Sequence, residues 1–236
     1  VLVESVQSRR PDVQPKAFLQ KLRQVTEQNN IALIFDEIIT GFRIGAGGAQ
    51  EYFGIRADIA TYGKVLGGGM PIGVVTGRAK YMDCIDGGTW QFGDDSVPQE
   101  DEKRTFVAGT FSHHPMAMAA AYASLQHIKE NKETLYKELN QKTENLVKRL
   151  NELFQSEGVG INVVHFGSLF RFVLQGDYEM FYYGMVEKGI YIWEGRNCFL
   201  STEHTDEDLD KIVEAARQTI HEMQEYGYFS GGLKKN

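Results

Sequence analysis

The sequence has few cysteines and no pattern that links them. Only Cys84 and Cys198 occur among the 236 residues. They form no Cys-x-x-Cys pair and have no zinc spacing, so we expect no metal site. A reduced, cytoplasmic protein is the simplest interpretation, with both thiols as inert core residues.

Long apolar runs and an excess of positive charge are also lacking. No uninterrupted apolar stretch approaches the length that spans a bilayer. Lys and Arg number 25 against 32 Asp and Glu, which gives a formal net charge of −7. This balance disfavours a broad nucleic-acid surface and a polybasic membrane patch, so we expect neither a nucleic acid nor a membrane as a partner.

Apart from these absences, the composition is typical of a globular protein, and the pattern of apolar residues predicts an α/β fold. Apolar residues make up 42% and charged residues 24% of the chain. Residues 1–5 are expected to form a short buried strand, residues 16–29 a helix, and residues 31–35 an apolar strand that ends at Asp36. A strand, a helix and a strand in this order predict a parallel sheet.

The pattern changes in the second half, where we expect a separate α+β portion. A helix with small side chains begins at Pro115, and a second helix with a leucine stripe covers residues 132–154. The expected domains are residues 1–130 and 131–236. Other expected elements are strands at 59–62 and 72–76, a surface loop at 83–104, paired strands at 163–166 and 168–174, a helix at 181–188, short strands at 190–192 and 198–200, and a helix from Thr205.

Asp36 is the first candidate functional residue. It ends a predicted parallel strand, and ligands bind at the carboxyl edge of open α/β sheets. A carboxylate there needs a partner or a cation. On position alone, a helix cap or a turn former explains Asp36 better than a binding role does.

Lys64 is the second candidate. It follows a predicted strand and precedes the glycines 67–69, which let the backbone approach a bulky ligand. A lysine in such a place can act as an amine nucleophile. The alternative is a surface lysine beside a flexible turn. A phosphate-binding P-loop is excluded, because the lysine precedes the glycines.

Taken together, three segments resemble the signatures of class III pyridoxal phosphate (PLP) enzymes. They are Phe35–Arg43, Tyr62–Gly69 and Ala108–Ser112, in that order. The resemblance runs through essentially the whole chain and includes Gly48–Gly54 and Trp193–Thr202. Within this family the chain is similar to glutamate-1-semialdehyde aminomutase and to the aminotransferase modules of polyketide–peptide synthases, and Trp193–Thr202 is more like the modules.

The resemblance implies a fold and a set of roles. The fold is the C-terminal part of a fold type I large domain, followed by a small α+β domain. Lys64 forms the Schiff base with the PLP aldehyde and then acts as general base. Asp36 pairs with the pyridine nitrogen and Ile38 packs against the ring. Thr110 donates to the cofactor phosphate in the neighbouring subunit, which implies a homodimer.

Other residues near these motifs are weaker candidates. His113 and His114 follow the phosphate-binding threonine, and a position at a helix N-terminus explains at least one of them. Arg196 either holds a substrate carboxylate or packs between domains.

The resemblance also implies a reaction. The expected activity transfers an amino group from an amino-acid donor to a ketone or aldehyde, with a β-keto acyl chain on an acyl carrier protein as the favoured acceptor. The alternatives are an aminomutase that moves an amino group within one semialdehyde, and a non-catalytic dimerisation or docking piece. The family's first half is not matched, so we expect this piece alone to be inactive.

Overall fold

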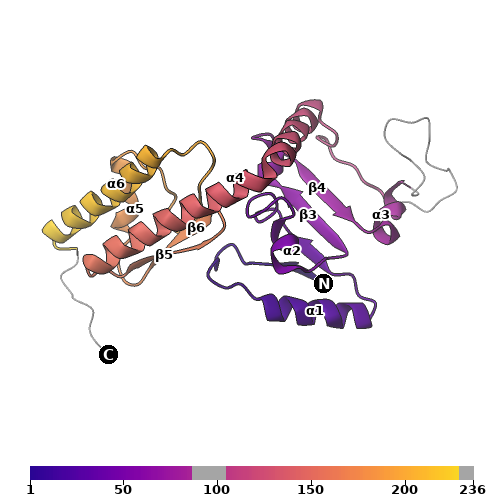
Figure 1. Cartoon of the computed structure of the whole chain (residues 1–236), viewed down its shortest axis with the longest axis horizontal. Helices are drawn as coiled ribbons and strands as arrows, with labels where there is room; N and C mark the ends of the chain where they lie inside the picture. The colour runs from indigo at the N-terminus through magenta and orange to yellow at the C-terminus, as the bar shows by residue number, and fades with distance from the viewer. Residues whose placement is uncertain (87–104, 229–236) are drawn as a thin grey trace. The chain divides into compact units, whose positions relative to one another are not determined.

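A computed structural model describes residues 1–86 and 105–228. The chain divides into two compact units, which Figure 1 shows with their elements labelled. The first unit contains residues 1–5 and 15–131. The second contains residues 6–14 and the chain from Lys132 onward. The expected domain boundary at residues 130 and 131 stays a prediction.

The first unit is built on a four-stranded sheet in the order β1-β2-β3-β4. Its strands are β1 (Leu2–Glu4), β2 (Ile34–Asp36), β3 (Ile59–Gly63) and β4 (Gly73–Gly77). The first three run parallel and β4 is antiparallel to β3. Helix α1 (Lys16–Gln28) connects β1 to β2, so the predicted strand–helix–strand unit and the α/β fold class are confirmed.

Strand β1 differs from the buried strand that its composition suggests. Leu2 is 64% exposed and Glu4 is exposed as well. The reason is its position: among the described residues β1 is an edge strand, paired only with β2. An apolar edge strand of this kind can pair with another strand, from the same protein or from another molecule.

Helix α3 (Ala79–Asp86) overlaps the start of the surface loop expected at residues 83–104. The loop prediction is therefore wrong for residues 83–86. Residues 87–104 lie outside the described part of the chain.

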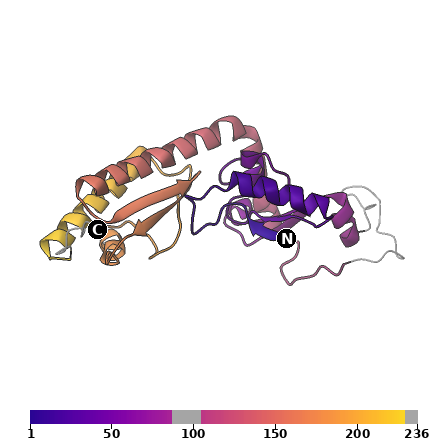
Figure 2. The same cartoon turned by 90° about the horizontal axis from the view of Figure 1, so that it is seen from below.

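Helix α4 (Pro115–Ser156) is one helix of 42 residues, where two were expected. Figures 1 and 2 show it without a break. The predicted division after residue 131 is wrong because the stretch from Ile128 to Leu135 holds no glycine or proline that would end a helix.

The second unit combines a three-stranded antiparallel sheet with helices. The hairpin predicted around Gly167 is confirmed by β5 (Ile161–Phe166) and β6 (Leu169–Leu174). Strand β7 (Cys198–Phe199) pairs with β6, and residues 190–192, expected as a strand, form none. Helices α5 (Met180–Glu187) and α6 (Asp206–Glu225) complete the unit. Thr205 caps α6 in a reciprocal capping box with Asp208.

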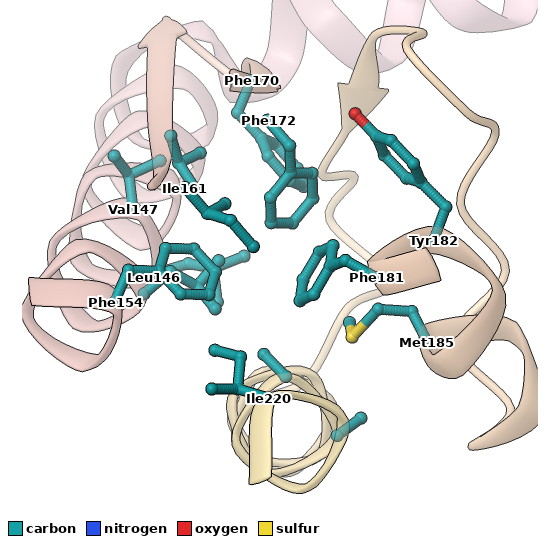
Figure 3. Close-up of a cluster of buried hydrophobic side chains, with 14 of the residues drawn as sticks. Leu146, Val147, Phe154, Ile161, Phe170, Phe172, Phe181, Tyr182, Met185 and Ile220 are labelled. Atoms are coloured by element: carbon teal, nitrogen blue, oxygen red, sulfur yellow. The ribbon is translucent and has the colours of Figure 1, made fainter. Parts of the chain in front are cut away.

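The core of the second unit lies between its sheet and the three helices. Figure 3 shows side chains from α4, α5, α6 and the hairpin pointing toward one another. Phe181 is fully buried at the centre, with its ring centroid 5.7 Å from that of Phe154 and 5.3 Å from that of Phe172. The Asn151 side chain adds a polar link, because it accepts from Val163 N at 2.7 Å and donates to Val163 O at 2.9 Å.

The two cysteines have different environments. Cys84 is exposed, so its assignment to the core is wrong: it lies on a short surface helix. Cys198 is partly buried, and burial raises the pKa of its thiol to about 11.

Within residues 1–86 and 105–228 we find neither a helix that could span a membrane nor a cluster of metal ligands. None of their helices is long and apolar enough to cross a membrane. In the same residues, no group of three or more His, Cys, Asp or Glu side chains is placed to hold a metal ion.

Candidate active site

Asp36 ends β2 with its two carboxylate oxygens in different situations. Oδ1 accepts from the backbone N–H of Ile38 at 3.0 Å and from the hydroxyl of Thr61 at 3.3 Å. Oδ2 takes part in no hydrogen bond with any described residue. The carboxylate is only partly buried. It therefore retains one acceptor oxygen for a further donor.

Lys64 begins the turn that follows β3. Its backbone has φ +45°, a left-handed conformation that costs a residue with a side chain about 1–2 kcal/mol. The residue is exposed, and its amine makes no ion pair or hydrogen bond within residues 1–86 and 105–228. Strained backbone at a lysine with a free amine is typical of a functional position.

The glycines after Lys64 let this turn approach α4 closely. Lys64–Gly67 form a 3-10 turn that ends at Gly68, with φ +55°. A methyl group on Gly68 would lie 2.6 Å from Oγ of Ser124 and 3.3 Å from the carbonyl oxygen of Ala120. The small side chains of α4 and the missing side chain of Gly68 thus make room for the turn.

Strand register brings Asp36 and Lys64 to the same sheet edge. Asp36 is the partner of Thr61 in the parallel β2–β3 pair, and Glu37 N donates to Thr61 O at 3.0 Å. Lys64 follows Thr61 by three residues, which span about 10 Å of extended chain. Ile38 is close as well: a methyl group on Gly63 would lie 3.8 Å from its Cγ2.

Sequence reasoning missed Glu37, a fully buried carboxylate next to Asp36. Its Oε2 accepts from Thr40 Oγ1 at 2.7 Å and Ala49 N at 2.9 Å, and its Oε1 accepts from Gln50 N at 2.9 Å. It thereby holds the first turn of α2 (Gly48–Phe53). The signal in the sequence was alternation, because successive side chains at a strand end point to opposite sides.

Helix α2 in turn contacts Tyr62, the residue before Gly63. Gln50 donates to the Tyr62 hydroxyl at 3.1 Å and accepts from Ala57 N at 2.9 Å. Burial, and then the negative charge of Glu37, raise the pKa of Tyr62. Phe42 packs on the same ring with a centroid distance of 5.3 Å. Hydrogen bonds and ring packing thus join the ends of β2 and β3 beneath the site.

The remaining candidates Thr110, His113 and Arg196 are exposed. Thr110 and His113 are exposed in the segment before α4, and His113 has φ +56°. Neither Thr110 nor His113 has a hydrogen bond to Asp36 or Lys64 among the described residues. Arg196, in the second unit, is exposed and lies over the ring of Trp193 at 5.2 Å.

The donors and acceptors at the sheet edge fit part of a PLP molecule. Oδ2 of Asp36 is an acceptor for a protonated ring nitrogen, the free amine of Lys64 suits an aldehyde, and Ile38 offers an apolar surface for a ring. The roles of Asp36, Ile38, Lys64 and Thr110 stay predictions.

Comparison by sequence identifies a family and several named relatives. The family model described as aminotransferase class III matches residues 1–220. The chain is 37% identical over 246 residues to glutamate-1-semialdehyde 2,1-aminomutase of Alkaliphilus oremlandii, covering 95% of this chain and 52% of that protein. The same enzyme of Archaeoglobus fulgidus is 34% identical over 221 residues, covering 87% and 49%.

Solved structures agree with the sequence relatives. A transaminase with PLP bound superposes with a TM-score of 0.84 at 25% identity, covering 97% of this chain and 53% of that one. The β-phenylalanine aminotransferase from Variovorax paradoxus gives a TM-score of 0.75 at 30% identity, covering 95% and 52%. The chain spans about half the length of the relatives that it matches. The predicted fold type I architecture and the PLP cofactor are thereby confirmed at the level of the family, and the chain belongs to the class III aminotransferases.

Proposed function

We propose that the complete protein containing this chain transfers an amino group from an amino-acid donor to a keto or aldehyde acceptor, with PLP as cofactor. The observation that supports it is the arrangement at the sheet edge. Within the described residues, Oδ2 of Asp36 and the amine of Lys64 have no partner. The two residues lie at the carboxyl ends of adjacent parallel strands, in a chain of the class III family.

Each residue at the edge has a definite task in this reaction. PLP, when bound, supplies an aldehyde that reacts with amines and a ring that accepts electrons from the substrate α-carbon. Asp36 Oδ2 accepts from the ring nitrogen and favours its protonated form. Lys64 Nζ would move the proton between the substrate α-carbon and the C4′ carbon of the cofactor, as general base and then general acid. Ile38 packs against the ring and excludes water from one face.

For the acceptor we favour a β-keto acyl chain on an acyl carrier protein, made in polyketide or lipopeptide biosynthesis. Support comes from the similarity of Trp193–Thr202 to synthase-embedded modules. We further propose a homodimer, in which Thr110 reaches the phosphate in the neighbouring subunit. The cysteine pattern supports a cytoplasmic location.

A specific observation favours a second candidate, intramolecular amino transfer. The relatives that match this chain at about 35% identity are named glutamate-1-semialdehyde 2,1-aminomutase. Product analysis with and without an external amino donor separates the two reactions. A transferase needs the donor for each turnover, whereas an aminomutase converts its semialdehyde without one.

Borohydride reduction of the PLP-loaded complete protein tests the enzyme itself. We expect a stable cofactor adduct on the peptide that contains Lys64. Lys64→Ala should lose the adduct, and Lys80→Ala is the matched control, because Lys80 is a lysine of the same unit that bonds Asn30 at 3.0 Å. Absence of any adduct in the complete protein would instead support a non-catalytic dimerisation or docking role.

We expect the chain by itself to be inactive, because it spans only about half the length of the relatives that it matches. Purified as a 236-residue chain, it should transaminate far more slowly than the complete protein. Equal rates would refute this part of the proposal.

A further inference from the structure

We propose that Thr61 is a positioning residue, whose hydroxyl holds Oδ1 of Asp36 so that Oδ2 remains the acceptor for the cofactor's ring nitrogen. This inference rests on the proposed function. It gives a role to Thr61, which the proposed function does not use. Thr61 does not touch the reacting atoms in this scheme. It acts through Asp36.

The geometry of Asp36 supports this role. Its Oδ1 has two donors, Ile38 N at 3.0 Å and Thr61 Oγ1 at 3.3 Å. The first donor belongs to the same turn, two residues further on, a local contact that aspartate commonly makes. The second comes from β3, 25 residues away in sequence. One donor from the same turn leaves a carboxylate free to swing about its Cβ–Cγ bond, whereas a second donor from the neighbouring strand restricts that rotation.

The contact also bears on the ion pair with the cofactor. A carboxylate oxygen that stays directed at the ring nitrogen favours the protonated nitrogen more than an oxygen that swings away from it. Thr61 thus supports the direction of the group that the cofactor ring requires.

The hydroxyl of Thr61 is separable from the role of Thr61 in the sheet. The strand pairing uses its backbone, since Thr61 O accepts from Glu37 N at 3.0 Å. The side chain is half-buried, and Asp36 is its hydrogen-bond partner among the described residues. Valine has the same branched shape and a similar preference for strands, so Thr61→Val removes the donor and leaves the strand in place.

The experiment compares three variants of the complete protein. Thr61→Val lacks the hydroxyl, Thr61→Ser keeps it, and Thr76→Val makes the same change on β4, where an exposed threonine makes no side-chain hydrogen bond with the described residues. The readouts are the dissociation constant of PLP and the protonation of its ring nitrogen, followed by NMR of isotopically labelled cofactor across pH.

We expect Thr61→Val to bind PLP about tenfold more weakly, the effect of losing one hydrogen bond to a charged group. Its ring nitrogen should lose the proton at a lower pH than in the parent. Thr61→Ser and Thr76→Val should match the parent in both readouts.

Three results would overturn the inference. They are a Thr61→Val protein that equals the parent, a Thr61→Ser protein that behaves like Thr61→Val, and a Thr76→Val protein that shifts as far as Thr61→Val. If the parent itself binds no PLP, the proposed function fails as well, so the two failures are distinguishable.

Discussion

Replacing Glu37 by glutamine tests the buried link beneath the site. The Glu37 carboxylate is fully buried and accepts three hydrogen bonds, two of them from the first turn of α2. A glutamine offers one oxygen and one NH2 group. Whichever way the amide is turned, its NH2 group meets an N–H donor, and the negative charge is lost.

The size of the effect follows from these contacts. A hydrogen bond to a charged group contributes about 1.5–3 kcal/mol, and a buried donor left unpaired costs about 1–3 kcal/mol. Because the surroundings relax in part, we expect Glu37→Gln to lower the free energy of unfolding by about 2–4 kcal/mol. PLP should also bind more weakly, because α2 carries Gln50, which donates to Tyr62, two residues before Lys64.

Urea denaturation of the complete protein, with saturating and with no PLP, measures the change. Glu51→Gln is the matched control: Glu51 is exposed and accepts one backbone hydrogen bond, from Gly47 N at 2.9 Å. It should cost less than about 1 kcal/mol. If Glu37→Gln were no more destabilising than Glu51→Gln, the buried carboxylate would not hold α2 as described.

Two further predictions concern the second unit. Gly184→Ala should destabilise the second unit by about 1–2 kcal/mol in thermal or urea unfolding, because the added methyl group overlaps Thr219 on α6. The double variant Gly184→Ala with Thr219→Ala should recover most of this loss. If stability does not recover, the contact with Thr219 is not the cause. Burial raises the pKa of Cys198 from 9.0 to about 11, so the folded state keeps the proton that the unfolded state releases above pH 9. Stability should therefore be constant below pH 9 and fall by up to about 2–3 kcal/mol between pH 9 and 11; Cys198→Ala should remove this component of the pH profile, and an unchanged profile would contradict the assignment.

Much of the fold could be predicted from local patterns. Apolar runs and helical spacing located α1, β2, β3 and the β5–β6 hairpin, and Thr205 with three acidic residues marked the start of α6. These signals are short in range, because periodicity and capping depend on residues a few positions apart. The error at α4 came from a local signal that was not used: residues 128–135 hold no glycine or proline that would end a helix, so one helix continues through them.

The candidate site divides in the same way. From the sequence we could predict that Asp36 ends one strand of a parallel sheet, that Lys64 follows another, and that their motifs resemble those of class III PLP enzymes. The burial of Glu37, its hold on α2 and the hydrogen bond from Thr61 to Asp36 became visible in the folded chain. The physical reason is register: which residue of β3 lies beside Asp36 depends on how strands 25 residues apart pair, and that follows from the packing of the whole unit.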